Sequence, residues 1–252
     1  MTFIPPFVAI LVCDTQIETL KKFGDFGDQA ITLFRSAGLT DCEFRKYDVI
    51  EKMEYPTAEE LAGCKGIYLT GSRSDSFDSL PWIVKLRDFL RLCLNEYEFP
   101  ITASCFGHQI IATALDMQVT RSPEGWEMGL MEIKLNPEIQ IGSLASNDSK
   151  NTVTVMEMHQ DIVVGELPEG YANVGSTDGC KYQGIYKKNK LLTFQGHPEF
   201  TTDCGNILVD SRLDAGKITK ETYDDAMGRN SKLSNDGVRI GKCMVDLLNG
   251  AL

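Results

Sequence analysis

The sequence has no hydrophobic run long enough to cross a membrane, which takes about 20 consecutive apolar residues. The longest apolar run near the N-terminus covers only residues 7–13. No basic residue comes before Lys21 and no small-x-small cleavage site precedes Asp14, so this run does not resemble a signal peptide. We therefore expect a cytoplasmic protein that has no membrane as a partner.

Positive charge is also scarce. The 252 residues contain 25 Lys and Arg against 36 Asp and Glu, which gives a formal net charge of -11 at pH 7. This balance would repel both a polyphosphate backbone and an anionic membrane surface. We therefore expect no nucleic acid among the partners.

Closely spaced metal ligands are absent too. Eight cysteines are present, but even the closest two, Cys93 and Cys105, stand 12 residues apart, so there is no Cys-x-x-Cys. This spacing excludes the usual zinc and thioredoxin-like motifs, and in a reducing compartment disulfides are not expected. The chain has only three histidines. We predict no metal and no organic cofactor.

What the sequence does contain is an alternation of strands and helices. Segments 7–13, 42–49, 66–70 and 99–104 predict strands, and segments 26–37, 81–93 and 107–117 predict helices. This order is typical of an α/β protein with three layers, an open, mostly parallel sheet between flanking helices. After residue 118, short alternating segments and a hairpin at 184–194 predict a small antiparallel extension. We expect one domain, residues 1–252, with a core at about 7–200 and C-terminal helices at about 202–250.

The segment 103–109 is the first candidate for chemistry. Here a strand ends, Cys105 follows, and a helix begins almost at once. Such a turn places a nucleophile on a tight bend at the top of a sheet, and the nearby helix N-terminus lowers the pKa of a thiol. A buried structural cysteine is the alternative, and the local pattern alone leaves the two interpretations about even.

The segment 193–200 is the second candidate. His197 and Glu199 are two residues apart, so in an extended backbone both side chains leave on the same side. The carboxylate can then fix the imidazole tautomer while the other ring nitrogen faces a nucleophile. A surface histidine beside a solvated glutamate is the alternative.

Two polar segments follow predicted strands. The loop from Gly71 to Ser79 follows the third strand, and its free backbone N–H groups can stabilise an oxyanion over Cys105 if the two strands are neighbours. The segment 157–161, which contains His159, Gln160 and Asp161, offers donors and acceptors for a zwitterionic ligand. A plain turn or cap is the alternative for this segment.

Together these segments resemble the class I glutamine amidotransferases. That family carries Gly-x-Cys-x-Gly-x-Gln at its nucleophile and Gly-His-Pro-Glu downstream. Here Cys105, Gly107 and Gln109 match the first motif and residues 196–199 match the second, in the family's order. The resemblance implies a flavodoxin-like fold and a catalytic triad of Cys105, His197 and Glu199. The family pattern differs at three positions, where this chain has Ala103, Ser104 and Ser72.

The resemblance also assigns the remaining site residues. It implies that the backbone N–H groups of Ser72 and Phe106 form an oxyanion hole. It further implies that the substrate is bound by Gly71, Gln109, His159, Gln160 and Asp161. The wording Phe-Gly-His-Gln at 106–109 is similar to the glutaminase domain of GMP synthase, but the synthase motif Ser-Gly-Gly-x-Asp-Ser does not occur.

Residues 71–78 and 82–86 are similar to stand-alone members of the family, the γ-glutamyl peptidases. We therefore expect a cysteine hydrolase that cleaves γ-glutamyl amide bonds through a thioester, with a small γ-glutamyl compound as its substrate. Two alternatives stay open: a glutaminase subunit that supplies ammonia to a separate synthase, and a catalytically silent binding protein with this fold. The sequence does not decide between a synthase partner and a homo-oligomer.

Overall fold

The computed structural model describes residues 6–145 and 151–252 and contains a nine-stranded sheet with the strand order β2-β1-β3-β4-β11-β10-β9-β6-β7. The strands of this sheet are β1 (Phe7–Val12), β2 (Glu43–Asp48), β3 (Cys64–Leu69), β4 (Ile101–Ser104), β6 (Glu127–Leu135), β7 (Thr152–His159), β9 (Ala172–Ser176), β10 (Gly184–Lys187) and β11 (Leu191–Phe194). A separate ribbon pairs β5 (Gln118–Arg121) with β8 (Asp161–Val164).

The first half of the sheet is parallel. Strands β2, β1, β3, β4 and β11 run in one direction, with Phe194 in β11 level with Ser104 in β4. Strand β1 is buried along almost its whole length because helices cover both faces of the sheet, and this explains its unbroken apolar sequence. The predicted parallel core is thus confirmed.

The second half of the sheet is antiparallel. Strands β10, β9, β6 and β7 continue the main sheet, and β10 and β11 form the predicted hairpin. The antiparallel extension predicted after residue 118 is confirmed. The sequence predicts neither the ribbon β5–β8 nor the order in which β9, β6 and β7 continue the main sheet. These pairings depend on contacts between segments far apart in the chain, which local patterns do not encode.

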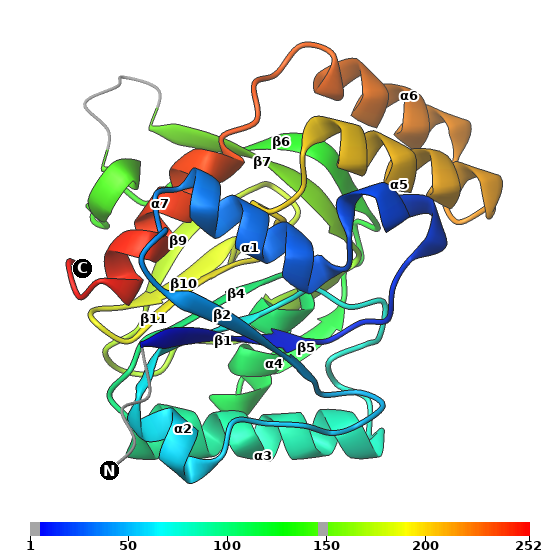
Figure 1. The fold of residues 1–252 in the computed structure, drawn as a ribbon. Coiled ribbons are helices and arrows are strands. Elements are labelled where there is room, and N and C mark those ends of the chain that lie inside the picture. The colour runs from blue at the N-terminus through cyan, green and yellow to red at the C-terminus, as the bar shows by residue number, and fades with distance from the viewer. Residues whose placement is uncertain (1–5, 146–150) are drawn as a thin grey trace.

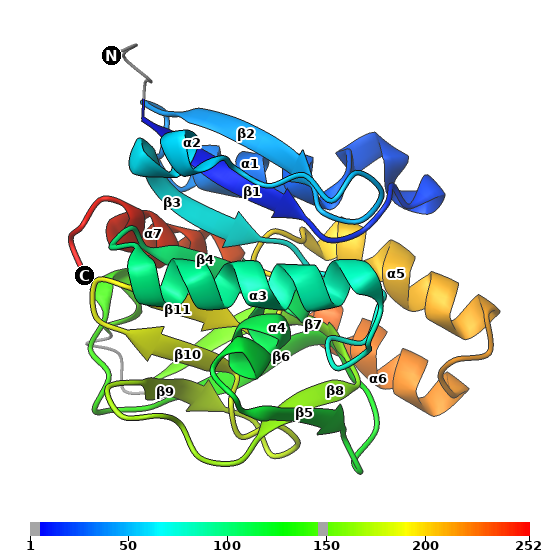
Figure 2. The same ribbon diagram turned by 90° about the horizontal axis from the view of Figure 1, so that it is seen from below.

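Helices form the outer layers on both faces of the sheet (Figures 1 and 2). Helices α1 (Phe26–Ser36) and α7 (Gly237–Leu248) cover one face, and α3 (Pro81–Glu96) and α4 (Phe106–Ala114) cover the other. The short α2 (Ala58–Ala62) lies beside α3. Local sequence explains the helix starts: Asp25 and Asp28 form a capping box for α1, and Pro81 occupies the first turn of α3.

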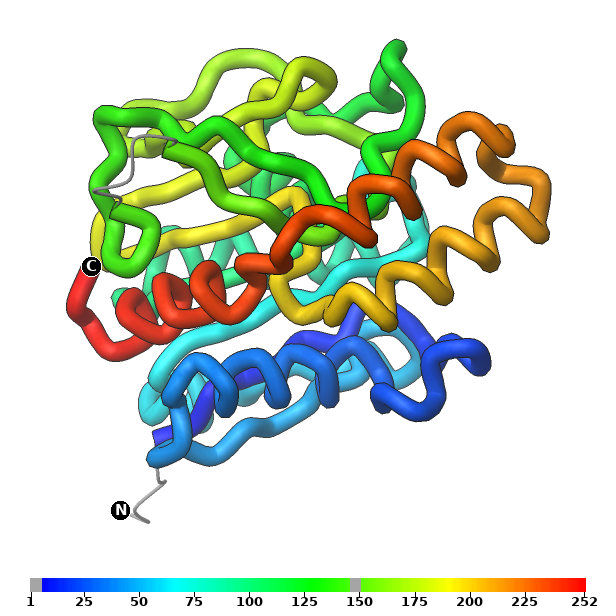
Figure 3. Tube along the Cα trace, turned by 90° about the horizontal axis from the view of Figure 1, so that it is seen from above, coloured from blue at the N-terminus to red at the C-terminus, as the bar shows by residue number. Residues whose placement is uncertain are grey.

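The C-terminal helices α5 (Thr202–Asp214) and α6 (Lys220–Asn230) pack against the antiparallel half of the sheet and against the 3-10 turn η1 (Glu18–Phe23). Seen from above, α1, α7, α5 and α6 lie on the same face of the molecule (Figure 3). A second 3-10 turn, η2 (Gly142–Leu144), contacts α7. Within the described residues, no helix is long and apolar enough to cross a membrane.

The carboxyl ends of β1, β3, β4 and β11 meet at one edge of the sheet because these strands are adjacent and parallel. The loops that leave this edge carry Asp14, Gly71, Cys105 and His197. Edges of this kind are where α/β proteins place their functional sites. The fold therefore brings together segments that are far apart in the sequence.

Candidate active site

Cys105 lies on a strained turn between β4 and α4. Its backbone has φ 48° and ψ -110°, a conformation that residues with a side chain rarely adopt, and its N–H donates to the Phe194 carbonyl at 2.9 Å. The turn needs Gly107, because a Cβ at that position would lie 2.8 Å from both Cβ and O of Leu69. Strain of this kind is typical of functional sites and favours a nucleophile over a structural cysteine.

The imidazole of His197 lies between Cys105 and Glu199. Its Nδ1 is 2.8 Å from Glu199 Oε1, and its ring stacks on Phe200 with centroids 4.0 Å apart. Burial is the largest influence and lowers the pKa of His197, but the adjacent Cys105 sulfur and the Glu199 carboxylate outweigh it and raise that pKa to about 10. The ring is therefore suited to carry a proton beside a thiolate.

Ser104 bonds directly to this group of residues. Its Oγ is 2.9 Å from Glu199 Oε1 and 2.8 Å from the Tyr68 hydroxyl. A carboxylate can only accept, so Ser104 donates to Glu199 and accepts from Tyr68. Burial and the charge of Glu199 raise the pKa of Tyr68 well above its usual value, which keeps this donor protonated. Sequence analysis noted Ser104 only as a departure from the family pattern and missed this role.

The loop after β3 packs directly on the imidazole. A Cβ at Gly71 would lie 2.6 Å from His197 Cε1, so only glycine permits this approach. The loop is held by Asp14, whose carboxylate accepts from the Arg73 backbone N–H at 2.7 Å and from its guanidinium at 2.7 Å. Asp14 follows β1 in the chain and was missed by sequence analysis, although a carboxylate after one parallel strand and an arginine after its neighbour were the available signal.

A small cavity of about 70 Å³ opens beside the Cys105 side chain. Its lining includes six residues that the sequence had singled out, namely Ser72, Cys105, Gln109, His159, Gln160 and Asp161. It also includes seven residues that sequence analysis did not propose for a ligand, namely Arg73, Ser74, Asp75, Arg121, Trp126, Met158 and Arg212. Gly71 lies beside the cavity on His197, and Phe106 begins α4 directly after Cys105. The structure therefore brings all the predicted site residues to one place.

Gln109 and Asp161 are joined across the cavity wall. The Gln109 side-chain nitrogen donates to the Asp161 carbonyl at 3.1 Å and to the Gln195 side-chain oxygen at 3.2 Å. These contacts use only the Gln109 side-chain nitrogen, so its side-chain oxygen can accept a hydrogen bond from another group. Burial raises the pKa of the Asp161 carboxyl to about 6, while Arg121, 3.0 Å away, opposes that shift.

His159 is turned into the protein interior, although it lines the cavity. Its Nδ1 lies 3.0 Å from the Asp161 carbonyl, and its Nε2 lies 3.0 Å from Glu127 Oε2 and 3.2 Å from Glu157 Oε2. Burial lowers the pKa of His159, but the two glutamates outweigh it and raise that pKa to about 10. Its Nδ1 thus contacts the Asp161 carbonyl and its Nε2 faces two carboxylates of the protein, so this side chain supports the wall of the cavity.

His108 is a structural residue. Its Nδ1 lies 2.8 Å from the Thr193 hydroxyl, and the side chain is fully buried under the sheet. Burial lowers its pKa to about 3, so the ring is neutral at physiological pH. Packing therefore explains the presence of His108 in the segment 106–109, which resembles GMP synthase.

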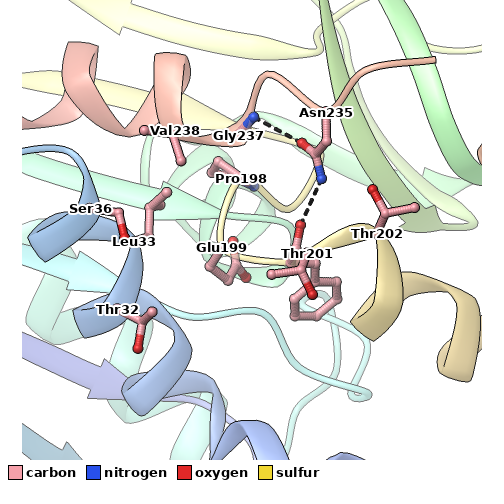
Figure 4. Close-up of a pocket in the computed structure, with 11 residues that line it drawn as sticks. Thr32, Leu33, Ser36, Pro198, Glu199, Thr201, Thr202, Asn235, Gly237 and Val238 are labelled. Carbon is pink, nitrogen blue, oxygen red and sulfur yellow. Dashed lines mark hydrogen bonds between the residues drawn. The ribbon is translucent and has the colours of Figure 1, made fainter.

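A larger cavity of about 320 Å³ is lined by residues of α1, of the loop 198–202 and of the start of α7. Figure 4 shows Leu33 and Val238 facing it, with Asn235 bridging the Gly237 N–H and the Phe200 carbonyl, both at 2.9 Å. Cys105 does not line this cavity. Of these two cavities, only the smaller one would place a bound ligand next to the Cys105 sulfur.

Metal ligands do not cluster in the part of the chain that the structure describes. No group of three or more His, Cys, Asp or Glu side chains is arranged to hold a metal ion there.

The buried charge of His159 should make the stability of the protein depend on pH. A histidine in the unfolded chain has a pKa of about 6.5, whereas that of His159 is about 10 in the folded protein. Its contribution is fully present below about pH 6.5 and is lost as the pH rises towards 10, at about 1.4 kcal/mol per pH unit. Urea unfolding at pH 7, 8 and 9 should show a falling free energy of unfolding.

The variant Glu157→Gln is the matched control for this prediction. It removes one of the two carboxylates that raise the His159 pKa, so the loss of stability should be complete at a lower pH. A free energy of unfolding that stays level or rises from pH 7 to 9 in the wild type would contradict a buried imidazolium at this position.

Comparison with known proteins identifies the family. The family model for class I glutamine amidotransferases matches residues 25–208. The Saccharomyces cerevisiae protein named "Putative glutamine amidotransferase YLR126C" is 37% identical over 245 residues, which cover 93% of this chain and 94% of the relative. Gamma-glutamyl peptidase 4 of Arabidopsis thaliana is 28% identical over 214 residues, 83% of each chain.

The fold also matches a solved structure. A crystal structure of a glutamine amidotransferase from Thermotoga maritima has a TM-score of 0.71 with this structure, over 97% of this chain and 98% of that one, at 17% identity. The family and the fold expected from the sequence are thus confirmed. The chain belongs to the class I glutamine amidotransferases.

Proposed function

We propose that this protein is a cysteine hydrolase that cleaves γ-glutamyl amide bonds, with Cys105, His197 and Glu199 as its catalytic triad. The observation that carries the proposal is geometric: Cys105 and His197 both lie against Gly71 at the end of the parallel strands, and the His197 ring contacts Glu199 at 2.8 Å. A thiolate next to an imidazolium is the activated form of a cysteine nucleophile. Similarity to the γ-glutamyl peptidase supports the substrate class.

The first half of the reaction forms a thioester. The Cys105 sulfur attacks the γ-carbonyl carbon, and the tetrahedral intermediate then collapses with cleavage of the C–N bond. The proton that the leaving amine requires comes from the His197 imidazolium. Glu199 holds the ring by its Nδ1 and stabilises the charge that the ring carries before this transfer.

The second half releases glutamate. Neutral His197 takes a proton from a water molecule, the resulting hydroxide attacks the thioester, and the C–S bond breaks to regenerate the thiolate beside the imidazolium. During both halves we assign the developing oxyanion to the backbone N–H groups of Ser72 and Phe106. Phe106 is suited to this role because the first N–H groups of a helix have no partner within the helix.

We assign the glutamyl end of the substrate to Gly71, Gln109, Gln160 and Asp161. The Gln109 side-chain oxygen and the Asp161 carboxylate can accept from an α-ammonium group, and both residues line the cavity beside Cys105. His159 supports this wall from within, through its contact with the Asp161 carbonyl.

The purified protein should cleave γ-glutamyl peptides better than glutamine. A larger leaving group adds contacts away from the scissile bond, and such contacts can orient the carbonyl and raise turnover. We expect kcat/KM for γ-glutamyl-cysteine or glutathione to exceed that for glutamine at least tenfold, which is about 1.4 kcal/mol. The measurement uses the protein without partners, with Cys105→Ala protein as the blank.

A tenfold preference for glutamine would contradict this proposal and favour a glutaminase that supplies ammonia to a synthase. Absence of activity on all these compounds, with Cys105 intact and reduced, would instead favour a binding protein that keeps the fold.

A further inference from the structure

Arg212 is a cation of the cavity that the proposed reaction does not use. It lies on α5 and lines the same cavity as Cys105, with its guanidinium 5.5 Å from the ring centroid of Trp126. Its Nε atom is buried and has no hydrogen-bond partner among the residues that the structure describes. A buried donor without a partner is costly, so it points to a group that joins it when the cavity is filled.

The other two arginines of the cavity are already neutralised. Arg73 contacts Asp14 at 2.7 Å, and Arg121 contacts Asp75 at 2.8 Å and Asp161 at 3.0 Å. No such carboxylate pairs with Arg212 within residues 6–145 and 151–252. Burial, followed by repulsion from Arg73, lowers the pKa of Arg212. Arg212 therefore brings to the cavity of Cys105 a positive charge that has no carboxylate in direct contact within the described residues.

A carboxylate is the ligand that suits this charge. The planar guanidinium offers donors in a fixed fork that matches a carboxylate, and each such charge-assisted bond is stronger than a neutral one. Trp126 supplies an apolar face next to the guanidinium. A group that carries both an apolar stem and a carboxylate, as an amino acid does, fits this pair of side chains.

We infer that Arg212 binds the carboxylate of the leaving group, so that the preferred substrates are γ-glutamyl amino acids or short peptides with a free carboxyl end. This inference rests on the proposed function. The glutamyl end has candidate partners of its own on α4 and at the start of β8, namely Gln109, Gln160 and Asp161. Arg212 comes from α5, which lies well apart from β5 and β8 at this edge (Figure 2).

The test compares three substrates that share the glutamyl half. They are γ-glutamyl-alanine, γ-glutamyl-alaninamide, which lacks the terminal carboxylate, and glutamine. The variant Arg212→Met removes the charge and the guanidinium donors and keeps an unbranched apolar stem. We expect it to lower kcat/KM for γ-glutamyl-alanine about 30-fold and to change the other two less than about 3-fold. Arg212→Lys should retain part of the activity on γ-glutamyl-alanine, because it keeps the charge without the fork.

A binding measurement keeps the inference separate from catalysis. In the Cys105→Ala background, calorimetry should show γ-glutamyl-alanine binding more tightly than its amide, and Arg212→Met should abolish that difference. This result would support the carboxylate site even if the protein cleaved none of the compounds, an outcome that would overturn only the proposed function.

Two results would overturn the inference. An equal loss on all three substrates would assign Arg212 to the glutamyl carboxylate or to the Cys105 thiolate, which all three reactions share. Equal binding of the acid and the amide to the protein with Arg212 intact would show that no leaving-group carboxylate is recognised.

Discussion

Replacing Cys105 by alanine should reduce turnover of γ-glutamyl substrates by a factor on the order of 10⁴–10⁶. The variant loses the sulfur to which we assign the thioester, and among the described residues no second thiol lines the cavity. Initial rates on γ-glutamyl-cysteine, measured over hours at high enzyme concentration, give the residual activity. The variant should remain folded because alanine removes a single atom from a side chain that is 6% exposed.

Cys243→Ala is the matched control for this variant. Cys243 is also buried, but it lies on α7, where its thiol contacts the Ile141 carbonyl. It should keep near wild-type activity. A Cys105→Ala enzyme as active as this control would refute the assignment of the nucleophile.

Alkylation provides an independent check on the same residue. Burial raises the pKa of each of the other seven thiols, which keeps them protonated and unreactive. Limiting iodoacetamide at mildly acidic pH should therefore label Cys105 first. Faster labelling of another cysteine would contradict the turn as a site of thiol activation.

Replacing His197 by alanine should cause a loss of similar size. The imidazole donates the proton that the leaving amine needs and later activates water, so both halves of the reaction depend on it. Glu199→Gln should be milder, because the amide still contacts the ring and loses only the charge that stabilises it. Both effects should appear in kcat more than in KM, since neither side chain is assigned to substrate binding.

The double variant Cys105→Ala/His197→Ala separates this role from a structural one. Residues that act as a unit are not additive, so the double variant should be about as slow as either single variant. Independent, multiplicative losses would show that His197 does not act through Cys105. Thermal unfolding of each variant controls for damage to the stacking on Phe200.

The sequence predicted the parts of the site that are encoded within a few residues. The turn at Cys105 follows from a strand, a small residue and a helix in immediate succession, and the pair His197 and Glu199 follows from a spacing of two. The helix starts and the hairpin were predicted for the same reason. These features depend on backbone geometry that the local residues determine.

Contacts between distant segments were not predicted. The pair Asp14 and Arg73 is separated by 59 residues, and it exists because β1 and β3 are neighbours in the sheet. Arg212 reaches the cavity only through the placement of α5 against the antiparallel half of the sheet. Sequence periodicity identifies elements but does not reveal which of them will be adjacent.

The orientation of His159 could not be predicted either. Successive side chains on a strand point to opposite faces, so Glu157 and His159 share a face of β7 by their spacing. Which face is interior depends on the pairing of β7 with β6, where Glu127 lies opposite His159. The sequence therefore predicts that Glu157 and His159 share a face of the strand, but it does not predict that this face is interior.

Because β4 and β11 pair level with each other, the relative position of Cys105 and His197 depends little on the residues that separate them in the sequence. Ser104 and Phe194 are partners in adjacent strands, so the turn at Cys105 and the loop of His197 leave the sheet side by side. The residues between these strands include α4, β5, β7 and β8, and each of these elements contributes to the wall of the cavity beside Cys105. Substitutions in these walls can therefore change which ligand the cavity accepts while the turn at Cys105 and the loop of His197 keep their relative positions.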